Sequence, residues 1–112
     1  MKIIKSEDNL VVFDNGLELI GEGHYDCCAY NYSDFEQFPV GTEFNDMNVE
    51  QFCSNMTLKE DGFFIKDIEG TPKWTQARSS QNGYYSSLTD LIVKMGNESK
   101  AFENICGELN YN

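Results

Sequence analysis

The sequence has few of the side chains that catalysis usually requires, and few positively charged residues. Its 112 residues include a single histidine and a single arginine, and no lysine or arginine lies between Lys5 and Lys59. Histidine is the usual general acid or base near neutral pH, so the sequence offers few candidate catalytic residues. We therefore expect a non-enzymatic protein and assign no catalytic residue.

Long apolar runs are also absent. The sequence has no stretch of 18 apolar residues, and its start, MKIIKSED, lacks the apolar segment of a signal peptide. We therefore expect a cytoplasmic protein. The length, together with 8 phenylalanines and 6 tyrosines, predicts a single domain over 1–112 with one modest core.

Cysteine is present, but not in a metal-binding pattern. His24 and Cys27, with Cys28, Cys53 and Cys106 scattered behind them, supply the ligand types of one tetrahedral zinc site. A structural zinc site normally shows two paired ligand motifs, and only one weak pair is found here. Adjacent residues face opposite sides of a strand, so Cys27 and Cys28 cannot clasp one ion together. We expect buried, inert thiols, with neither a metal nor a cofactor.

Two further sequence motifs for ligand binding are incomplete, and each lacks a required glycine. The run from Asp46 to Glu50 is similar to the start of a calcium loop, but Gln51 stands where the loop needs glycine. Gly21-Glu22-Gly23 lacks the third glycine of a dinucleotide loop, and its glutamate would repel phosphate. Neither motif predicts a ligand.

Turn signals divide the first half into strands and short helices. Asp14-Asn15-Gly16 separates two apolar runs, 10–13 and 17–20, which predicts a β-hairpin, with a short strand before it at 2–5. Ser33-Asp34-Phe35-Glu36 fits a capping box, so one or two helical turns are expected from 34 to 38, ended by Pro39. A second short helix is expected at 48–54, from the spacing of its apolar residues.

The second half predicts a β-meander and then a helix. Strands are expected at 56–59, 63–65, 73–78 and 88–95, the last apolar enough to be central. A further hairpin signature stands at Gln81-Asn82-Gly83, before Tyr84-Tyr85. The apolar residues of the tail lie on one helical stripe, which predicts a helix over 98–108 that packs on the sheet. These residues are Ala101, Phe102, Ile105, Cys106 and Leu109.

Together these elements predict an α+β fold. One twisted antiparallel sheet of about five to seven hairpin-linked strands is covered by the short central helices and the C-terminal helix. The aromatic residues expected in the core are Phe35, Phe38, Phe44 and Phe52.

Negative charge is the strongest remaining feature. The formal net charge is −11, and 11 acids fall in the cation-free interval. Such a chain is repelled by nucleic acid and by anionic membranes, and attracted to basic surfaces. Tyrosine adds rigid contact area beside carboxylates that accept bonds from arginine. An ordinary solvated face explains the same composition equally well. The residues expected to bind a basic partner are Glu18, Glu22, Asp26, Tyr30, Tyr32, Asp34, Glu36, Glu43, Asp46 and Glu50.

The double-cysteine segment carries a resemblance. Tyr25-Asp26-Cys27-Cys28, followed by Asn31-Tyr32 and Asp34-Phe35, and later Asn82-Gly83-Tyr84-Tyr85, resembles a family of small domains of bacteriophages and prophages. The resemblance covers roughly 11–95 and implies a compact accessory protein made inside an infected bacterium. As a class, short acidic phage proteins resemble inhibitors of host defence, including anti-CRISPR proteins and DNA mimics. The implied partner is a basic, nucleic-acid-handling host protein.

Two other functions remain open. Trp74, Tyr84 and Tyr85 could stack on a nucleotide signal whose phosphate is bound by Arg78 and Lys73, which would make the protein a ligand sponge. Alternatively, Cys27 or Cys28 could act in an enzyme or redox protein, if His24 activated one of them.

Overall fold

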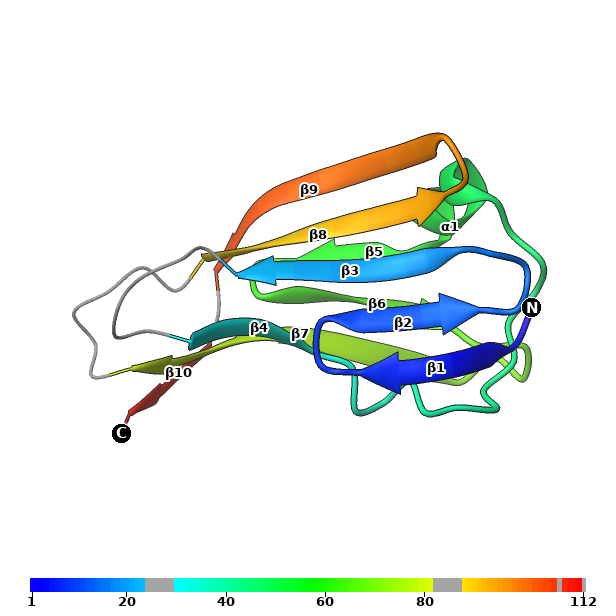
Figure 1. Cartoon of the computed structure of the whole chain (residues 1–112). Helices are drawn as coiled ribbons and strands as arrows, with labels where there is room; N and C mark the ends of the chain where they lie inside the picture. The colour runs from blue at the N-terminus through cyan, green and yellow to red at the C-terminus, as the bar shows by residue number, and fades with distance from the viewer. Residues whose placement is uncertain (24–29, 82–87, 107, 112) are drawn as a thin grey trace.

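The computed structural model describes residues 1–23, 30–81, 88–106 and 108–111, with side chains up to 103. This part of the chain contains ten strands and one short helix, so the fold is mostly β (Figure 1). The elements are β1 (Ile3–Glu7), β2 (Leu10–Phe13), β3 (Glu18–Gly23), β4 (Tyr30–Asp34), α1 (Val49–Asn55), β5 (Thr57–Lys59), β6 (Gly62–Lys66), β7 (Pro72–Gln81), β8 (Leu88–Met95), β9 (Glu98–Cys106) and β10 (Glu108–Tyr111).

The strands form two sheets rather than the single sheet that the sequence predicted. Sheet one has the order β1-β2-β3-β8-β9, with every pair antiparallel. In sheet two, β7 pairs with β6, β4 and β10, and β5 pairs with β6; only β10 runs parallel to its neighbour. Figure 1 shows the sheets as two layers. Buried residues alternate with partly exposed ones in β2 and β8, as a two-layer β-sandwich requires.

Phenylalanines fill the space between the sheets. Phe35, Phe38, Phe44 and Phe52 are all fully buried, which confirms their prediction as core. They pack ring against ring, with centroid distances of 5.6 Å from Phe13 to Phe44 and 5.9 Å from Phe38 to Phe44. Burying each ring contributes about 1.5–3 kcal/mol. These aromatics therefore hold the two layers together at the end of the sandwich where α1 lies.

The predicted hairpin and the predicted helix at 48–54 are both found. β2 and β3 pair across a turn in which Gly16 N–H donates to Phe13 O at 3.0 Å, and Phe13 N–H donates to Leu17 O at 2.8 Å. α1 begins with a reciprocal capping box between Asn48 and Gln51. The strands expected at 2–5, 56–59, 63–65, 73–78 and 88–95 correspond to β1, β5, β6, β7 and β8, and β8 lies inside its sheet, between β3 and β9.

The predicted C-terminal helix is wrong. Residues 98–106 form β9, which follows a turn at 96–97 and pairs antiparallel with β8. Phe102 lies opposite Leu91 and packs against the core, whereas Ala101 lies opposite Ile92 on the outward face. The helical spacing of the apolar residues was outweighed by the free edge of β8, because an apolar strand gains more from pairing than a short isolated helix gains from its own hydrogen bonds.

The helix expected at 34–38 is also wrong. Asp34 is the last residue of β4, and its Oδ1 accepts from Glu36 N–H at 2.9 Å, which makes a turn instead of a helix cap. One backbone bond follows, from Phe38 N–H to Phe35 O at 2.9 Å. Aspartate favours both kinds of structure, and the burial of both phenylalanines selects the turn.

The hairpin expected at 81–85 lies mostly outside the described residues. The strands on either side of it, β7 and β8, belong to different sheets and do not pair with each other.

Candidate partner-binding surface

Strand β4 displays two tyrosines and an aspartate on one side. Its side chains alternate, so Tyr30, Tyr32 and Asp34 face outward while Asn31 and Ser33 are buried between the sheets. The Tyr30 ring is 55% exposed, and its centroid lies 5.0 Å from that of Tyr32, at an interplanar angle of 52°. The two rings form a rigid, partly apolar surface patch of the kind that is common in protein interfaces.

Asp34 is already engaged inside the protein. Arg78, on β7, donates from Nε to Asp34 Oδ2 at 2.7 Å, and both side chains are largely buried. Arg78 also lies directly opposite Tyr32 in the β4–β7 register. Asp34 therefore already pairs with a cation of its own chain, which leaves it less able to bind a cation of a partner.

The β1–β2 turn brings a second acid to the tyrosines. Asn9, with φ of 70°, donates its N–H to Ser33 O at 3.2 Å, and its Oδ1 accepts from Ser33 N–H at 2.8 Å. Its own carbonyl accepts from Gly21 N–H at 2.9 Å, so one residue joins β3 of sheet one to β4 of sheet two. Asp8 precedes Asn9 in this turn, and it is near enough to Tyr32 to influence the pKa of that hydroxyl.

Burial raises the pKa of Tyr32, and the charges around it act in both directions. Arg78 lowers that pKa, whereas Asp34, Asp8 and Tyr30 raise it. The hydroxyl is therefore protonated at neutral pH and can both donate and accept a hydrogen bond. We call Asp8, Tyr30, Tyr32, Asp34 and Glu36 the tyrosine–acid surface. In the described part of the chain, neither Asp8 nor Glu36 has an ion pair.

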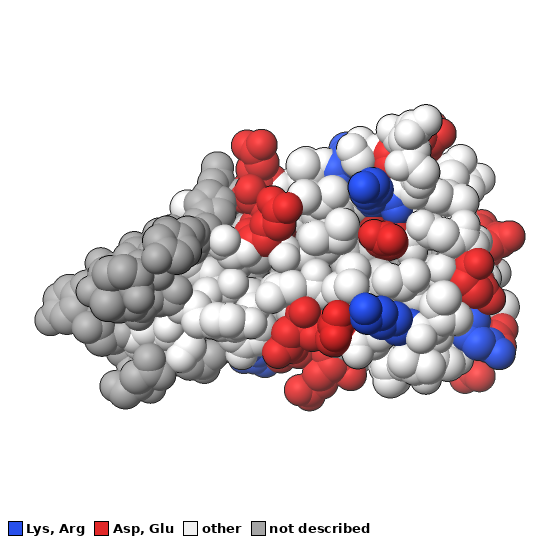
Figure 2. All heavy atoms as spheres, viewed as in Figure 1, with Lys and Arg blue, Asp and Glu red and all other residues white. Residues whose placement is uncertain are grey.

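The other expected contacts lie elsewhere on the molecule. Glu18 and Glu22 stand on β3 in sheet one, where Glu18 is directly opposite Lys94. Glu50 is in the first turn of α1. Figure 2 shows acids in separate groups on the visible face, several of them beside lysines or arginine. Asp26 lies outside the described residues. The structure therefore brings together four of the ten residues expected from the sequence, Tyr30, Tyr32, Asp34 and Glu36.

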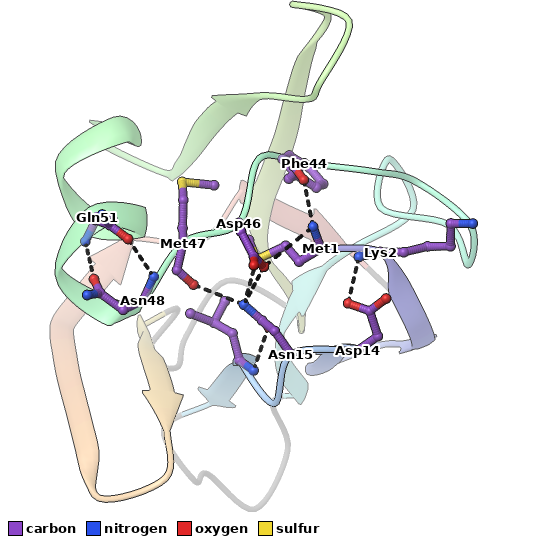
Figure 3. Close-up of polar contacts among 10 residues, drawn as sticks. Met1, Lys2, Asp14, Asn15, Phe44, Asp46, Met47, Asn48 and Gln51 are labelled. Carbon is purple, nitrogen blue, oxygen red and sulfur yellow. Dashed lines mark hydrogen bonds and ion pairs between the residues drawn. The ribbon is translucent and has the colours of Figure 1, made fainter.

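Glu43 and Asp46 belong to a structural network at the chain's start. Met1 donates from its ammonium group to Phe44 O at 2.8 Å and lies 3.7 Å from Asp46 Oδ1, as Figure 3 shows. Lys2 pairs with Glu43 at 3.5 Å. These contacts tie the first strand to the segment before α1. Glu43 and Asp46 therefore have a structural role that does not require a partner protein.

Asn15 completes this network from the β2–β3 turn. Its Nδ2 donates to Met47 O at 3.1 Å and to Asp46 Oδ1 at 3.3 Å, while its Oδ1 accepts from Leu17 N–H at 3.1 Å (Figure 3). The Asn-Gly turn therefore also fastens the loop before α1 to sheet one. Sequence reasoning recognised the turn but gave no sign of this second contact.

The residues considered for metal binding or catalysis are mostly outside the described part. His24, Cys27 and Cys28 fall in 24–29, and the side chain of Cys106 is not described. Cys53 is a half-buried free thiol, and burial raises its pKa while Lys100 lowers it. Among the described residues, no group of three or more His, Cys, Asp or Glu side chains is placed to hold a metal ion.

The residues considered for nucleotide binding do not all lie on one surface. Trp74 and Arg78 share the outward face of β7, but Lys73 has the opposite parity along the strand and borders a different hollow, beside Glu43 and Asp67. Tyr84 and Tyr85 lie outside the described residues. A larger open groove of about 680 Å³, which the sequence did not reveal, lies between α1 and β6 and is lined partly by Asn45, Gln51, Asn55, Phe64 and Asp67.

Comparison with protein-family models, curated proteins and solved structures gave no significant match. No helix in the described part is both long and apolar enough to span a membrane.

Proposed function

We propose that the protein acts by stoichiometric binding to a basic protein, through the tyrosine–acid surface. The observation that carries the proposal is the contact between the exposed Tyr30 and Tyr32, on a surface where Asp8 and Glu36 have no ion pair in the described part. Two touching tyrosines on a strand give contact area at low entropic cost. The free carboxylates of Asp8 and Glu36 select partners rich in lysine and arginine.

The partner that fits this chemistry is a protein with a cationic patch, such as a nucleic-acid-handling enzyme of host defence. The phage resemblance makes inhibition of such an enzyme, for instance a CRISPR effector, the specific form of the proposal. Mimicry of nucleic acid would need a continuous array of carboxylates, whereas the acids here are divided among several surfaces. We therefore propose local occupation of a basic patch by tyrosines and acids, rather than imitation of a whole duplex.

The experiment compares two variants that change the net charge equally. Asp8→Lys/Glu36→Lys alters the tyrosine–acid surface, and Glu50→Lys/Glu69→Lys reverses two exposed acids at other positions. Each immobilised protein is exposed to a bacterial lysate, after circular dichroism has verified its fold. Wild type and the control variant should retain the same stoichiometric basic protein, and the surface variant should lose it. Equal loss in both variants would mean that only total charge matters, and equal retention would exclude this surface.

A nucleotide-binding role has one supporting observation, the shared outward face of Trp74 and Arg78 on β7. The two residues are four positions apart on the strand, about 13 Å, so the indole could stack on a base while the guanidinium, which also pairs with Asp34, binds its phosphate. If this role is correct, cyclic nucleotides quench Trp74 fluorescence and raise the melting temperature of the wild type but not of Arg78→Gln. An unchanged melting temperature in the wild type would eliminate it.

A further inference from the structure

The turn between β2 and β3 contains the dipeptide Asn15-Gly16, and this dipeptide has a characteristic reaction in water. The backbone nitrogen of a residue that follows asparagine can attack the side-chain carbonyl carbon of that asparagine. Glycine permits this attack most readily, because it has no side chain to shield its nitrogen and its backbone is the most flexible. A second such dipeptide, Asn82-Gly83, lies outside the described residues.

The reaction is deamidation, and its atoms balance with water alone. The nitrogen of Gly16 loses its proton and bonds to Cγ of Asn15, while the bond from Cγ to Nδ2 breaks. The side-chain nitrogen leaves with that proton as ammonia. Water then opens the resulting five-membered succinimide at either carbonyl. One opening gives aspartate, and the other gives isoaspartate, in which the backbone runs through the former side chain.

In the folded protein both reacting groups are already engaged. Gly16 N–H donates to Phe13 O at 3.0 Å. At Asn15, Nδ2 donates to Met47 O at 3.1 Å and to Asp46 Oδ1 at 3.3 Å (Figure 3). The carboxamide cannot turn onto the glycine nitrogen without breaking these bonds, so the attack requires the turn to open locally.

The same bonds fasten the turn to the segment before α1, so their loss changes the structure. Aspartate at position 15 has no N–H to donate, which leaves Met47 O without this donor. It also places a second carboxylate beside that of Asp46, and like charges repel. Isoaspartate, in addition, adds a carbon atom to the backbone of the turn.

We propose that Asn15 is a deamidation site gated by the opening of the β2–β3 turn, and that its modification releases this turn from the segment before α1. The closed turn protects the asparagine, and each opening exposes it to an irreversible reaction. The turn is not part of the tyrosine–acid surface, so the proposed function does not depend on it.

Mass spectrometry of proteolytic peptides measures deamidation at Asn15 during incubation at mildly alkaline pH. The rate should be about a hundredfold lower in the folded protein than in urea, because the hydrogen bonds of the turn must break first. Asp46→Ala removes one of these bonds and should raise the folded-state rate about threefold. Glu43→Ala removes the same charge from the same segment, but Glu43 pairs with Lys2, so the wild-type rate should be kept.

Hydrogen exchange measures the structural consequence in Asn15→Asp, which reproduces one of the two products. Phe44 N–H donates to Met1 O at 2.8 Å in the same network, and it should exchange about tenfold faster than in the wild type. Asn45→Asp adds the same charge at an exposed position of the same segment and should leave this exchange unchanged.

Four results would overturn the proposal. Equal deamidation rates in the folded and urea-unfolded protein would show that the turn does not gate the reaction, and no deamidation at Asn15 in urea would remove the site itself. A rate raised equally by Asp46→Ala and Glu43→Ala would assign the effect to charge rather than to contact. Unchanged Phe44 exchange in Asn15→Asp would show that the modification releases nothing.

Discussion

Gly21 on β3 lies close against β4, and replacing it tests how the two sheets are joined. A Cβ at this position would lie 2.5 Å from Ser33 Oγ, 2.7 Å from Ser33 Cβ and 2.9 Å from Asn9 Oδ1. Carbon atoms normally approach to about 3.5–4.0 Å, so Gly21→Ala requires β3 and β4 to separate by roughly 1 Å. The hydrogen bonds between Asn9 and Ser33, which join the β1–β2 turn to β4, lie at the same point.

The expected cost follows from two opposing contributions. Overpacking costs about 1–3 kcal/mol, and replacing glycine by alanine returns about 0.4–1 kcal/mol by restricting the unfolded chain. The net loss of unfolding free energy is then about 1–2 kcal/mol, which lowers the melting temperature by roughly 4–8 °C. Thermal and urea unfolding of Gly21→Ala measure both quantities.

A double-mutant cycle with Ser33→Gly makes the reasoning refutable. Ser33→Gly removes both Ser33 atoms that the new methyl group meets, so Gly21→Ala/Ser33→Gly should be more stable than the sum of the two single changes by about 1 kcal/mol. Gly41→Ala is the control: its φ of 97° strains the backbone in open space, and Ser33→Gly should not relieve that strain. Additive effects in the first pair, or a Gly21→Ala protein as stable as wild type, would refute the close approach.

The remaining predictions concern the core, the helix cap, the partly buried Arg78–Asp34 ion pair and pH. Phe38→Ala should lower the unfolding free energy by about 3–5 kcal/mol in urea titrations, because its ring contacts Phe44 and Phe63 inside the core. Asn48→Ala should cost about 1 kcal/mol through loss of the α1 cap, and Asn48→Asp should restore most of it. Asp34→Asn should cost about 1 kcal/mol and increase the tyrosine mobility seen by relaxation measurements, since Arg78 loses its charged partner. The pKa of Tyr32 is raised above 10.0 in the folded state, so its contribution to the unfolding free energy is complete below pH 10 and is lost as the pH rises through the folded-state pKa. Tyr32→Phe should therefore remove this part of the decrease in unfolding free energy that is measured from pH 8 to 12.

Local patterns in the sequence were sufficient for much of the fold. The Asn-Gly turn predicted the β2–β3 hairpin, and the apolar spacing after Asn48 predicted α1, because both depend on residues close together in the chain. The division into two sheets depends on contacts far apart in sequence, such as Asn9 with Ser33, and periodicity carries no record of these. β9 shows the same limit of periodicity: its apolar residues have helical spacing, but the segment pairs with the edge of β8 instead.

The candidate surface was predictable only within one strand. Tyr30 and Tyr32 share one face of β4 because alternate residues of a strand point to the same side, and this follows from their spacing once the segment is a strand. The absence of lysine and arginine from 6 to 58 suggested uncompensated acids, but cations arrive from elsewhere: Arg78 reaches Asp34, Lys2 reaches Glu43, and the ammonium group of Met1 lies near Asp46. Asp8 was missed because its influence on Tyr32 depends on the contact between Asn9 and Ser33, which are far apart in sequence.

The most direct test of the account is the salt dependence of affinity for the captured partner, measured for wild type, Asp8→Lys/Glu36→Lys and Glu50→Lys/Glu69→Lys. Exposed charges at an interface are screened by salt, so affinity should fall as salt rises in the wild type and in the control variant alike. The surface variant should bind more weakly at low salt and show a clearly shallower salt dependence. Identical slopes for all three proteins would contradict the claim that the tyrosine–acid surface meets a basic partner.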